Sequence, residues 1–177
     1  RKIIQYASVD NADEFDADGG HGTHVAGTVA GNNGDDLFGD GKGKHAGIAP
    51  DAKLTIMDLS VPGSGIFVPS TYELFAAGYN AGARIQTMSW GSKLSNMQYY
   101  FNSMDDFMYK HQDFVILFAA GNYGADNVGK TTITRQANLK NAVSVGATES
   151  GDIGNIAYFS SMGPAYDGRI KPEIVAP

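Results

Sequence analysis

The sequence predicts an incomplete α/β domain in which a parallel central sheet is flanked by helices on both faces. Two observations support this fold class. Short runs rich in β-branched and aromatic residues alternate with amphipathic segments along the 177 residues, which is the pattern of successive βαβ units. In addition, the run FVILFAA (114–120) is apolar throughout, as expected of a strand that is covered on both faces.

The first half of the chain contains three expected strands and two expected helices. The strands are short runs that include Ile, Leu, Val and Thr, namely residues 2–9, 53–60 and 84–89. The first helix, 21–31, consists mostly of Gly, Ala, Thr and Val. The second helix, 69–83, begins with Pro-Ser-Thr, and a proline beside hydroxyl side chains is typical of a helix N-terminus.

The second half contains the clearest helix of the chain, at 95–111. Its apolar side chains recur at three- and four-residue spacing, and they are Met97, Tyr100, Phe101, Met104, Phe107 and Met108. Strands are expected at 114–120 and 142–148, and residues 172–177 begin a further element.

We expect one domain, 1–177, that is part of a longer protein. The two irregular regions, 32–50 and 122–141, are neither repeats nor low-complexity linkers. The chain opens on RKIIQY without an initiator Met and stops at IVAP, directly after an apolar run. These ends predict an internal piece rather than a whole chain.

The composition excludes several classes of function. Hydrophobic residues make up 42% of the chain, which is enough for a core, and the formal net charge is −6. An acidic chain without clustered Lys and Arg argues against nucleic acid as the main partner. The absence of cysteine removes disulfides and thiol nucleophiles. No stretch approaches the about 20 apolar residues of a membrane span, and no signal peptide is present.

Two histidines, His21 and His24, stand among small residues at the start of the first expected helix. A neutral imidazole that acts as a general base must be oriented and partly shielded, and the positive end of a helix dipole disfavours its protonation. Gly19 and Gly20 allow a sharp turn and the close approach of a substrate. From these residues alone, a structural histidine and an H-x-x-H metal pair stay open, although no third metal ligand is visible.

Two strand ends carry further candidate residues. FAAGNYG (118–124) places Asn122 just beyond the carboxyl end of an apolar strand, where parallel α/β folds bind their ligands. An amide there can donate a hydrogen bond to a developing oxyanion. MSWGS (88–92) also runs from a strand into Ser and Gly, and glycine lets a peptide substrate pair with the backbone. An ordinary turn explains each segment equally well by itself.

Together and in this order, these segments resemble the subtilisin-like serine proteases, or subtilases. The histidine motif of that family, HGTHVAG, stands letter for letter at 21–27. TMSWG (87–91) resembles the substrate-binding strand, AAGN (119–122) the oxyanion segment, and GIAPDAKL (47–54) the segment after the calcium-loop region. FSSMGPAYDGRIKPEIVAP (159–177) resembles the approach to the nucleophile. The resemblance covers nearly the whole chain.

The resemblance implies a subtilisin-like fold and serine-type endopeptidase activity on proteins or peptides. By the same resemblance His21 is the general base of an Asp-His-Ser triad, and Asn122 is the side-chain donor of the oxyanion hole. His24 is then an inward-facing structural residue. The residues implied to hold the peptide and wall the specificity pocket are Ser89, Trp90 and Gly91 on one side and Ala119, Ala120 and Gly121 on the other. Trp90 stands where smaller apolar residues are common, which leaves the pocket preference open.

The other two triad members have no counterpart in the sequence. The aspartate of the family precedes Ser/Thr-Gly, whereas Asp10, the sole internal candidate, precedes Asn-Ala. Asp16 is expected to be a surface-loop residue. The nucleophile motif Gly-Thr-Ser-Met-Ala does not occur, and Ser160 and Ser161 are expected to be structural residues in a strand. We therefore expect the isolated chain to be catalytically inactive.

The remaining expectations concern cofactors, location and the alternative function. Catalysis needs no cofactor, whereas the resemblance makes a structural calcium ion possible. Candidate oxygen ligands, which a solvated acidic loop explains equally well, are Asn32, Asn33, Asp35, Asp36 and Asp40. The family implies an extracellular location. The alternative function is a non-catalytic binding or scaffolding domain of the same fold; a nucleotide-binding domain lacks its glycine and lysine motifs here.

Overall fold

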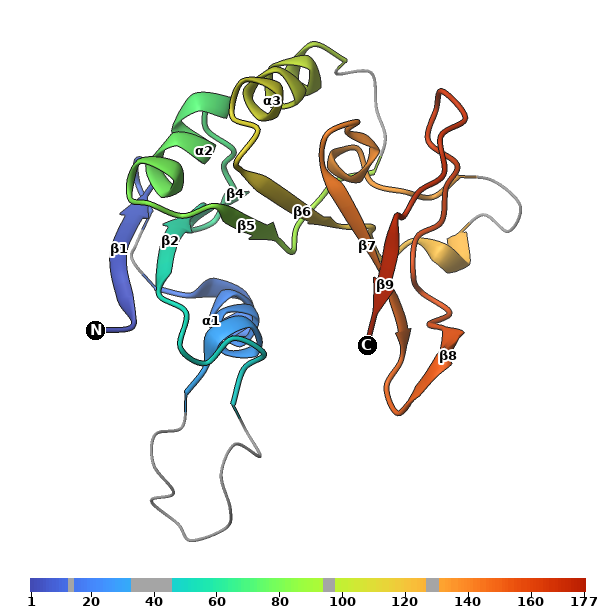
Figure 1. Cartoon of the computed structure of the whole chain (residues 1–177), viewed down its shortest axis with the longest axis horizontal. Helices are drawn as coiled ribbons and strands as arrows, with labels where there is room; N and C mark the ends of the chain where they lie inside the picture. The colour runs from blue at the N-terminus through green and yellow to red at the C-terminus, as the bar shows by residue number, and fades with distance from the viewer. Residues whose placement is uncertain (13–14, 33–45, 94–97, 127–130) are drawn as a thin grey trace, which may run out of the picture. The chain divides into compact units, whose positions relative to one another are not determined.

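The computed structural model describes residues 1–12, 15–32, 46–93, 98–126 and 131–177 (Figure 1). The described chain forms two compact units, residues 1–83 and residues 84–177. Of the helices that the structure describes, none combines the length and the apolar character that crossing a membrane requires.

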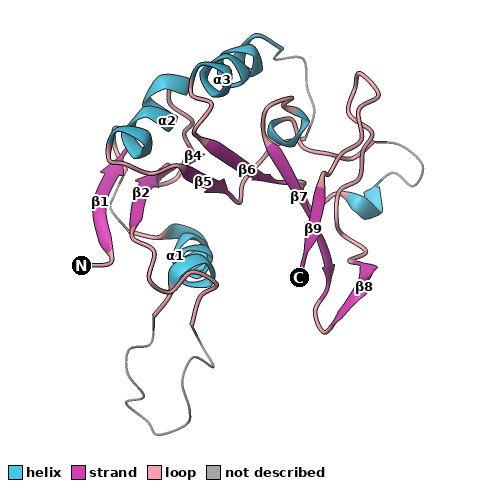
Figure 2. Ribbon diagram, in the orientation of Figure 1, coloured by secondary structure: helices cyan, strands magenta, loops and turns pink. Residues whose placement is uncertain are grey.

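The first unit contains a two-stranded parallel sheet, a short hairpin and two helices (Figure 2). Strands β1 and β2 pair in parallel, with Ala7 opposite Met57, and strands β3 and β4 pair antiparallel. The elements are β1 (Ile3–Ser8), α1 (Ala17–Ala30), β2 (Leu54–Asp58), β3 (Ser60–Val61), β4 (Gly65–Ile66) and α2 (Thr71–Asn80).

Polar side chains tie β1 to the segment around β2. The Lys2 ammonium donates hydrogen bonds to the carbonyl of Ala52, at 2.8 Å, and to that of Pro50. At the other end of the pair, the Tyr6 hydroxyl donates to a carboxylate oxygen of Asp58 at 2.8 Å. Side-chain bonds at both ends therefore supplement the backbone ladder.

Helix α2 confirms the helix expected at 69–83 and shows why it starts where it does. The Ser70 hydroxyl accepts from the Glu73 backbone N–H, and the Ser70 N–H donates to the Glu73 carboxylate, which is a complete capping box. Its buried residues are Thr71, Leu74, Phe75 and Ala76. The three- and four-residue spacing of Thr71, Leu74 and Phe75 places them on one face.

The second unit is built on a sheet in which β5, β6, β7 and β9 run parallel. Strand β8 pairs antiparallel with the end of β7. The elements are β5 (Ile85–Met88), α3 (Gln98–Lys110), β6 (Val115–Ala119), the 3₁₀ turns Gly124–Asp126 and Gln136–Asn138, β7 (Val143–Glu149), β8 (Asp152–Ile156) and β9 (Ile174–Ala176).

The core of the second unit lies between α3 and the sheet strands. Met104, Phe107 and Met108 of α3 are buried, which confirms these three positions of the predicted apolar stripe. The side chains of Met97, Tyr100 and Phe101 lie outside the described residues. In β6, Ile116 and Phe118 are buried.

Strand β6 has one face that is buried within the second unit. Alternate residues of a strand point to opposite faces, and Ile116 and Phe118 on one face are buried. On the other face Val115 is 47% exposed, and Leu117 and Ala119 are half-buried. Cover on both faces of β6 stays a prediction.

The α/β fold class and the parallel pairing are confirmed. The parallel strands are divided between the two units, as the β1–β2 pair and the set of β5, β6, β7 and β9. The sequence did not predict β3, β4 and β8, because the first two are only two residues long and β8 is exposed throughout.

Candidate active site

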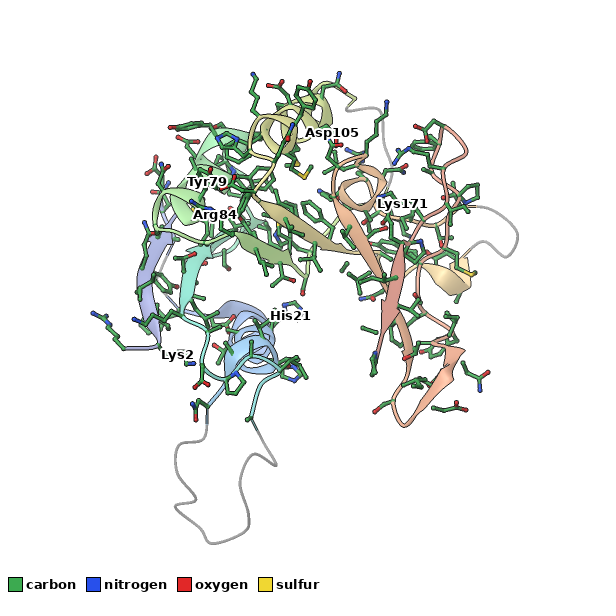
Figure 3. All side chains as sticks on the ribbon, viewed as in Figure 1. Lys2, His21, Tyr79, Arg84, Asp105 and Lys171 are labelled. Atoms are coloured by element: carbon green, nitrogen blue, oxygen red, sulfur yellow. The ribbon has the colours of Figure 1, made fainter. Side chains whose placement is uncertain are left out.

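His21 lies in the first regular turn of α1, and its side chain is exposed (Figure 3). The residues before it, Gly19 and Gly20, have φ of +74° and +84°. This left-handed conformation strains any residue with a Cβ, so these glycines are required for the turn that precedes His21. The helix was predicted to begin at residue 21, but α1 begins at Ala17, so the predicted start is four residues late.

Asp16 is the N-cap residue of α1, and its carboxylate bonds two backbone groups beyond the first turn, a role that the sequence analysis missed. Its carboxylate accepts hydrogen bonds from the backbone N–H of Gly22, at 3.2 Å, and of Thr23, at 2.5 Å. Hydrogen bonds from the Thr23 side chain and backbone, with a smaller contribution from the Gly22 N–H, hold the pKa of Asp16 below its usual value. Asp16 thus satisfies two free N–H groups next to His21.

The expectation that His24 faces inward is wrong, because its side chain is exposed. Close packing of α1 occurs at its C-terminal end, where Ala30 is fully buried. There Gly47 lies against the last turn, since a Cβ on Gly47 would stand 2.6 Å from the Gly27 carbonyl oxygen. The small residues of α1 therefore serve contact with the segment before β2.

In the second unit, the two segments predicted to bind substrate leave adjacent parallel strands. Met88, the last residue of β5, pairs with Phe118 of β6. Residues 89–91 and 119–121 consequently emerge at the same edge of the sheet, as the sequence predicts. Half-buried Trp90 packs edge-to-face on Phe118, with ring centroids 5.8 Å apart.

Thr134, another residue that the sequence analysis missed, lies between these two segments. It is 1% exposed, its N–H donates to the Ala120 carbonyl at 2.8 Å, and its hydroxyl donates to the Ala119 carbonyl at 3.2 Å. A Cβ on Gly91 or Gly121 would stand 3.0 Å or 2.5 Å from Thr134 side-chain atoms. A Cβ on Gly121 would therefore clash with Thr134, whereas a Cβ on Gly91 would make a tight contact with it.

Asn122 follows directly after this contact, with an exposed side chain. Gly121 before it has a φ of +117°. The chain turns away from β6 in this conformation, which only glycine adopts without steric cost. Among the residues that the structure describes, none accepts a hydrogen bond from the Asn122 amide. That amide can therefore donate to an oxygen of a bound ligand.

Ser160 and Ser161 are buried, as structural residues are, but they do not lie in a strand. They form part of the loop that follows β8, and their hydroxyls accept hydrogen bonds from backbone N–H groups of other segments. The expectation of a strand at this place is wrong, because these serines satisfy backbone groups through side chains rather than through a ladder.

The structure brings together the residues predicted at the two strand ends, and it places His21 in the first unit. Asp10 lines a cavity of about 360 Å³ together with Asn11 and the β3–β4 hairpin, and His21 is not among its lining residues. Asp10 therefore gains no support as a partner of His21.

Most of the candidate calcium ligands, Asn33, Asp35, Asp36 and Asp40, lie outside the described residues. The amide of the fifth candidate, Asn32, donates to the Pro50 carbonyl at 3.3 Å. Within the described ranges no three His, Asp or Glu side chains gather as a metal site requires. A calcium ion therefore stays a prediction.

Comparison with known proteins connects this geometry to one family. A model of the subtilase family matches residues 2–177. The serine protease/ABC transporter B family protein tagD of Dictyostelium discoideum is 39% identical over 162 residues, which are 85% of this chain and 8% of tagD. The serine protease AprX of Bacillus subtilis (strain 168) is 31% identical over 195 residues, covering 99% of this chain and 42% of AprX.

A solved structure of a subtilisin-like protease also has a similar fold. The crystal structure of the psychrophilic subtilisin-like protease Apa1 from Pseudoalteromonas sp. AS-11 matches with a TM-score of 0.66 at 22% identity, over 97% of this chain and 36% of that one. This chain thus spans less than half the length of each of these three proteins. Since the family model extends over nearly all of its residues, the chain belongs to the subtilase family.

Proposed function

We propose that this chain forms part of a serine endopeptidase, with His21 as the general base and Asn122 as a donor of the oxyanion hole. The observation that carries the proposal is the placement of Asn122. Its amide, without a partner in the part of the chain that the structure describes, stands after Gly121 at the edge of the sheet where residues 89–91 also emerge. Membership of the subtilase family supports peptide-bond hydrolysis in general.

The proposed reaction uses these groups in the following order. A serine hydroxyl attacks the scissile carbonyl carbon, and His21 accepts the hydroxyl proton as the C–O bond forms. The carbonyl π electrons move to oxygen, and the Asn122 amide donates a hydrogen bond to that oxyanion. His21 then transfers the proton to the leaving amine as the C–N bond breaks. Water repeats the sequence to release the acyl group.

The substrate backbone is proposed to lie between residues 89–91 and 119–121. Both segments leave neighbouring parallel strands at one edge of the sheet, so an extended peptide can pair with their backbone there. Thr134 fills the space beneath the glycines of both segments, and Trp90 supplies an aromatic surface beside them. The substrates are proteins or peptides.

The nucleophile of this reaction is proposed to be a serine outside the 177 residues. No serine in the sequence stands in a Gly-Thr-Ser motif, and both serines nearest to the expected place are buried hydrogen-bond acceptors. A fluorophosphonate should therefore label the natural full-length protein and leave the isolated 177-residue chain unlabelled. Labelling of a serine within the 177 residues would contradict this assignment.

The test of the oxyanion assignment is the variant Asn122→Ala in the natural full-length protein. Because the oxyanion exists only in the transition state, kcat should fall while KM changes little. The expected loss is on the order of 10²–10³-fold, which is the size known for this donor in subtilisin itself. An unchanged kcat would contradict the role of Asn122, whereas a natural full-length protein without peptide hydrolysis would favour the alternative, a non-catalytic binding domain. Extracellular secretion and a structural calcium ion are secondary proposals that rest on family resemblance.

A further inference from the structure

One buried residue holds both peptide groups that flank Asn122. The Ser161 backbone N–H donates to the carbonyl of Gly121 at 2.9 Å, and the Ser161 hydroxyl accepts from the backbone N–H of Tyr123 at 3.0 Å. Asn122 thus stands between two bonds to the same residue. Neither bond involves its side-chain amide, which has no partner among the described residues.

Ser161 is itself fixed in place. Its side chain is 0% exposed. Next to it, the Met162 backbone N–H donates to the Thr132 hydroxyl at 2.9 Å, and the Met162 carbonyl accepts from the Thr132 N–H at 2.8 Å. On the other side, the Phe159 carbonyl accepts from the Gly124 N–H at 2.8 Å. The loop of residues 159–162 therefore runs alongside residues 121–124 and is bonded to it at three points.

Gly121 makes such support necessary. Gly121 has a φ of +117°. Because glycine can adopt many other backbone conformations, local sterics do not determine the direction of Asn122. A Cβ on Gly121 would stand 2.8 Å from the Ser161 hydroxyl oxygen, which shows how closely the serine approaches this turn. The two hydrogen bonds select one state of the glycine.

We propose that Ser161 is a positioning residue that orients Asn122 toward the oxyanion. This inference rests on the proposed function, since it requires that Asn122 donates in the transition state. Ser161 acts only through Asn122 and touches no reacting atom. A donor displaced by about 1 Å can lose up to about 100-fold in rate, so loss of the clamp should appear in kcat.

The chain offers a matched control in the neighbouring serine. Ser160 is 3% exposed, and its hydroxyl accepts one backbone N–H, that of Ala147 in β7, at 2.9 Å. Ser160→Ala and Ser161→Ala therefore remove the same group from equally buried sites and leave one backbone N–H without its acceptor. Only the second change affects a peptide group next to Asn122.

The test is a double-mutant cycle between Ser161 and Asn122 in the natural full-length protein, measured on a chromogenic peptide substrate. Ser161→Ala should lower kcat by about 10- to 100-fold with little change in KM. In the Asn122→Ala background the same change should alter kcat by less than about 2-fold, because no donor is left to misplace. Ser160→Ala should leave kcat within about 2-fold in both backgrounds at a comparable loss of Tm.

Each alternative outcome of this cycle would contradict one specific claim. Equal losses from Ser161→Ala in both backgrounds would show a merely structural role and overturn this inference alone. An Asn122→Ala variant with unchanged kcat would overturn the proposed function and the inference with it. If Ser161→Ala does not fold, Ser161→Cys replaces it in the cycle, since a thiol of similar size is a weak acceptor, and the same non-additivity is expected.

Discussion

At the residue scale, side-chain hydrogen bonds fix the backbone next to the two proposed catalytic residues, His21 and Asn122. Asp16 accepts from the N–H groups of Gly22 and Thr23, and Ser161 bonds both peptides beside Asn122. In each case a glycine with positive φ precedes the functional side chain. Backbone freedom at the glycine is thus combined with a specific hydrogen bond that selects one conformation.

The Asp16 cap leads to a prediction about stability and pH. Asp16→Ala should reduce the free energy of unfolding by about 1 kcal/mol, the usual value of a helix cap, with Asp16→Asn losing less because its amide oxygen still accepts. The folded-state pKa of Asp16 is lowered, chiefly by hydrogen bonds from Thr23. The contribution of the cap should therefore be complete above the unfolded-state value of about 3.9 and be lost as pH falls through the folded-state pKa.

Urea unfolding at a series of pH values measures this effect. The difference between the natural protein and Asp16→Ala should be constant near neutral pH and vanish in acid. A difference that persists unchanged at a pH below the folded-state pKa would show that the cap does not depend on the charged carboxylate.

The same residues show what the sequence could and could not predict. His21 and Asn122 were singled out by the resemblance of their short segments to one family, because a helix start and a strand end by themselves left structural interpretations open. Asp16 was missed because two left-handed glycines place it six and seven residues before its partners, whereas a cap is sought two or three residues away. Thr134 and Ser161 were missed because their contacts join segments distant in sequence.

At the element scale, side-chain hydrogen bonds of Lys171 and Glu173, which also form an ion pair with each other, tie the segment before β9 to β7 and to Ala142. The Lys171 ammonium, with a side chain 0% exposed, lies 2.6 Å from the Glu173 carboxylate and donates to the Ala142 carbonyl at 3.0 Å (Figure 3). The other Glu173 oxygen accepts from the Ser144 N–H and hydroxyl, each at 2.7 Å. Burial alone would raise the pKa of Glu173, but the bonds from Lys171 and Ser144 lower it overall.

Removing the negative partner should destabilise this junction. Glu173→Gln leaves the buried Lys171 charge uncompensated, and such a change costs about 3–5 kcal/mol when both partners are buried. Because the Glu173 side chain is 37% exposed, we expect a smaller loss, about 2 kcal/mol. Urea unfolding measures it, and Glu173→Gln combined with Lys171→Met should recover part of the loss. A single variant as stable as the natural protein would contradict the role of the pair.

Element prediction succeeded where a periodic or apolar pattern coincided with a terminal signal. Helix α2 has both its apolar face and the Ser70–Glu73 capping box, and its place was predicted. Strand β8 has five exposed residues and no such pattern, because its pairing with β7 comes from the turn between them. The apolar run of β6 predicted a strand at its observed place, whereas cover on a second face depends on what lies against the strand, which its own residues do not encode.

At the scale of the whole molecule, the proposed chemistry draws on both compact units. His21 belongs to residues 1–83, and Asn122 with the substrate-binding segments belongs to residues 84–177. The chain also covers only 8% of tagD and 42% of AprX. Activity is therefore a property to be measured on the natural full-length protein, while the cap and the ion pair are properties of single units.

The most direct test of the central claim compares two histidines of the same helix in that protein. His21 and His24 are both exposed on α1, so replacing either with Ala removes a similar side chain from a similar surface. His21→Ala should lower kcat for peptide hydrolysis by about 10⁶-fold, as loss of a triad histidine does in subtilisin, while His24→Ala should stay within about 2-fold. Equal activity of the two variants would contradict the assignment of His21 as the general base.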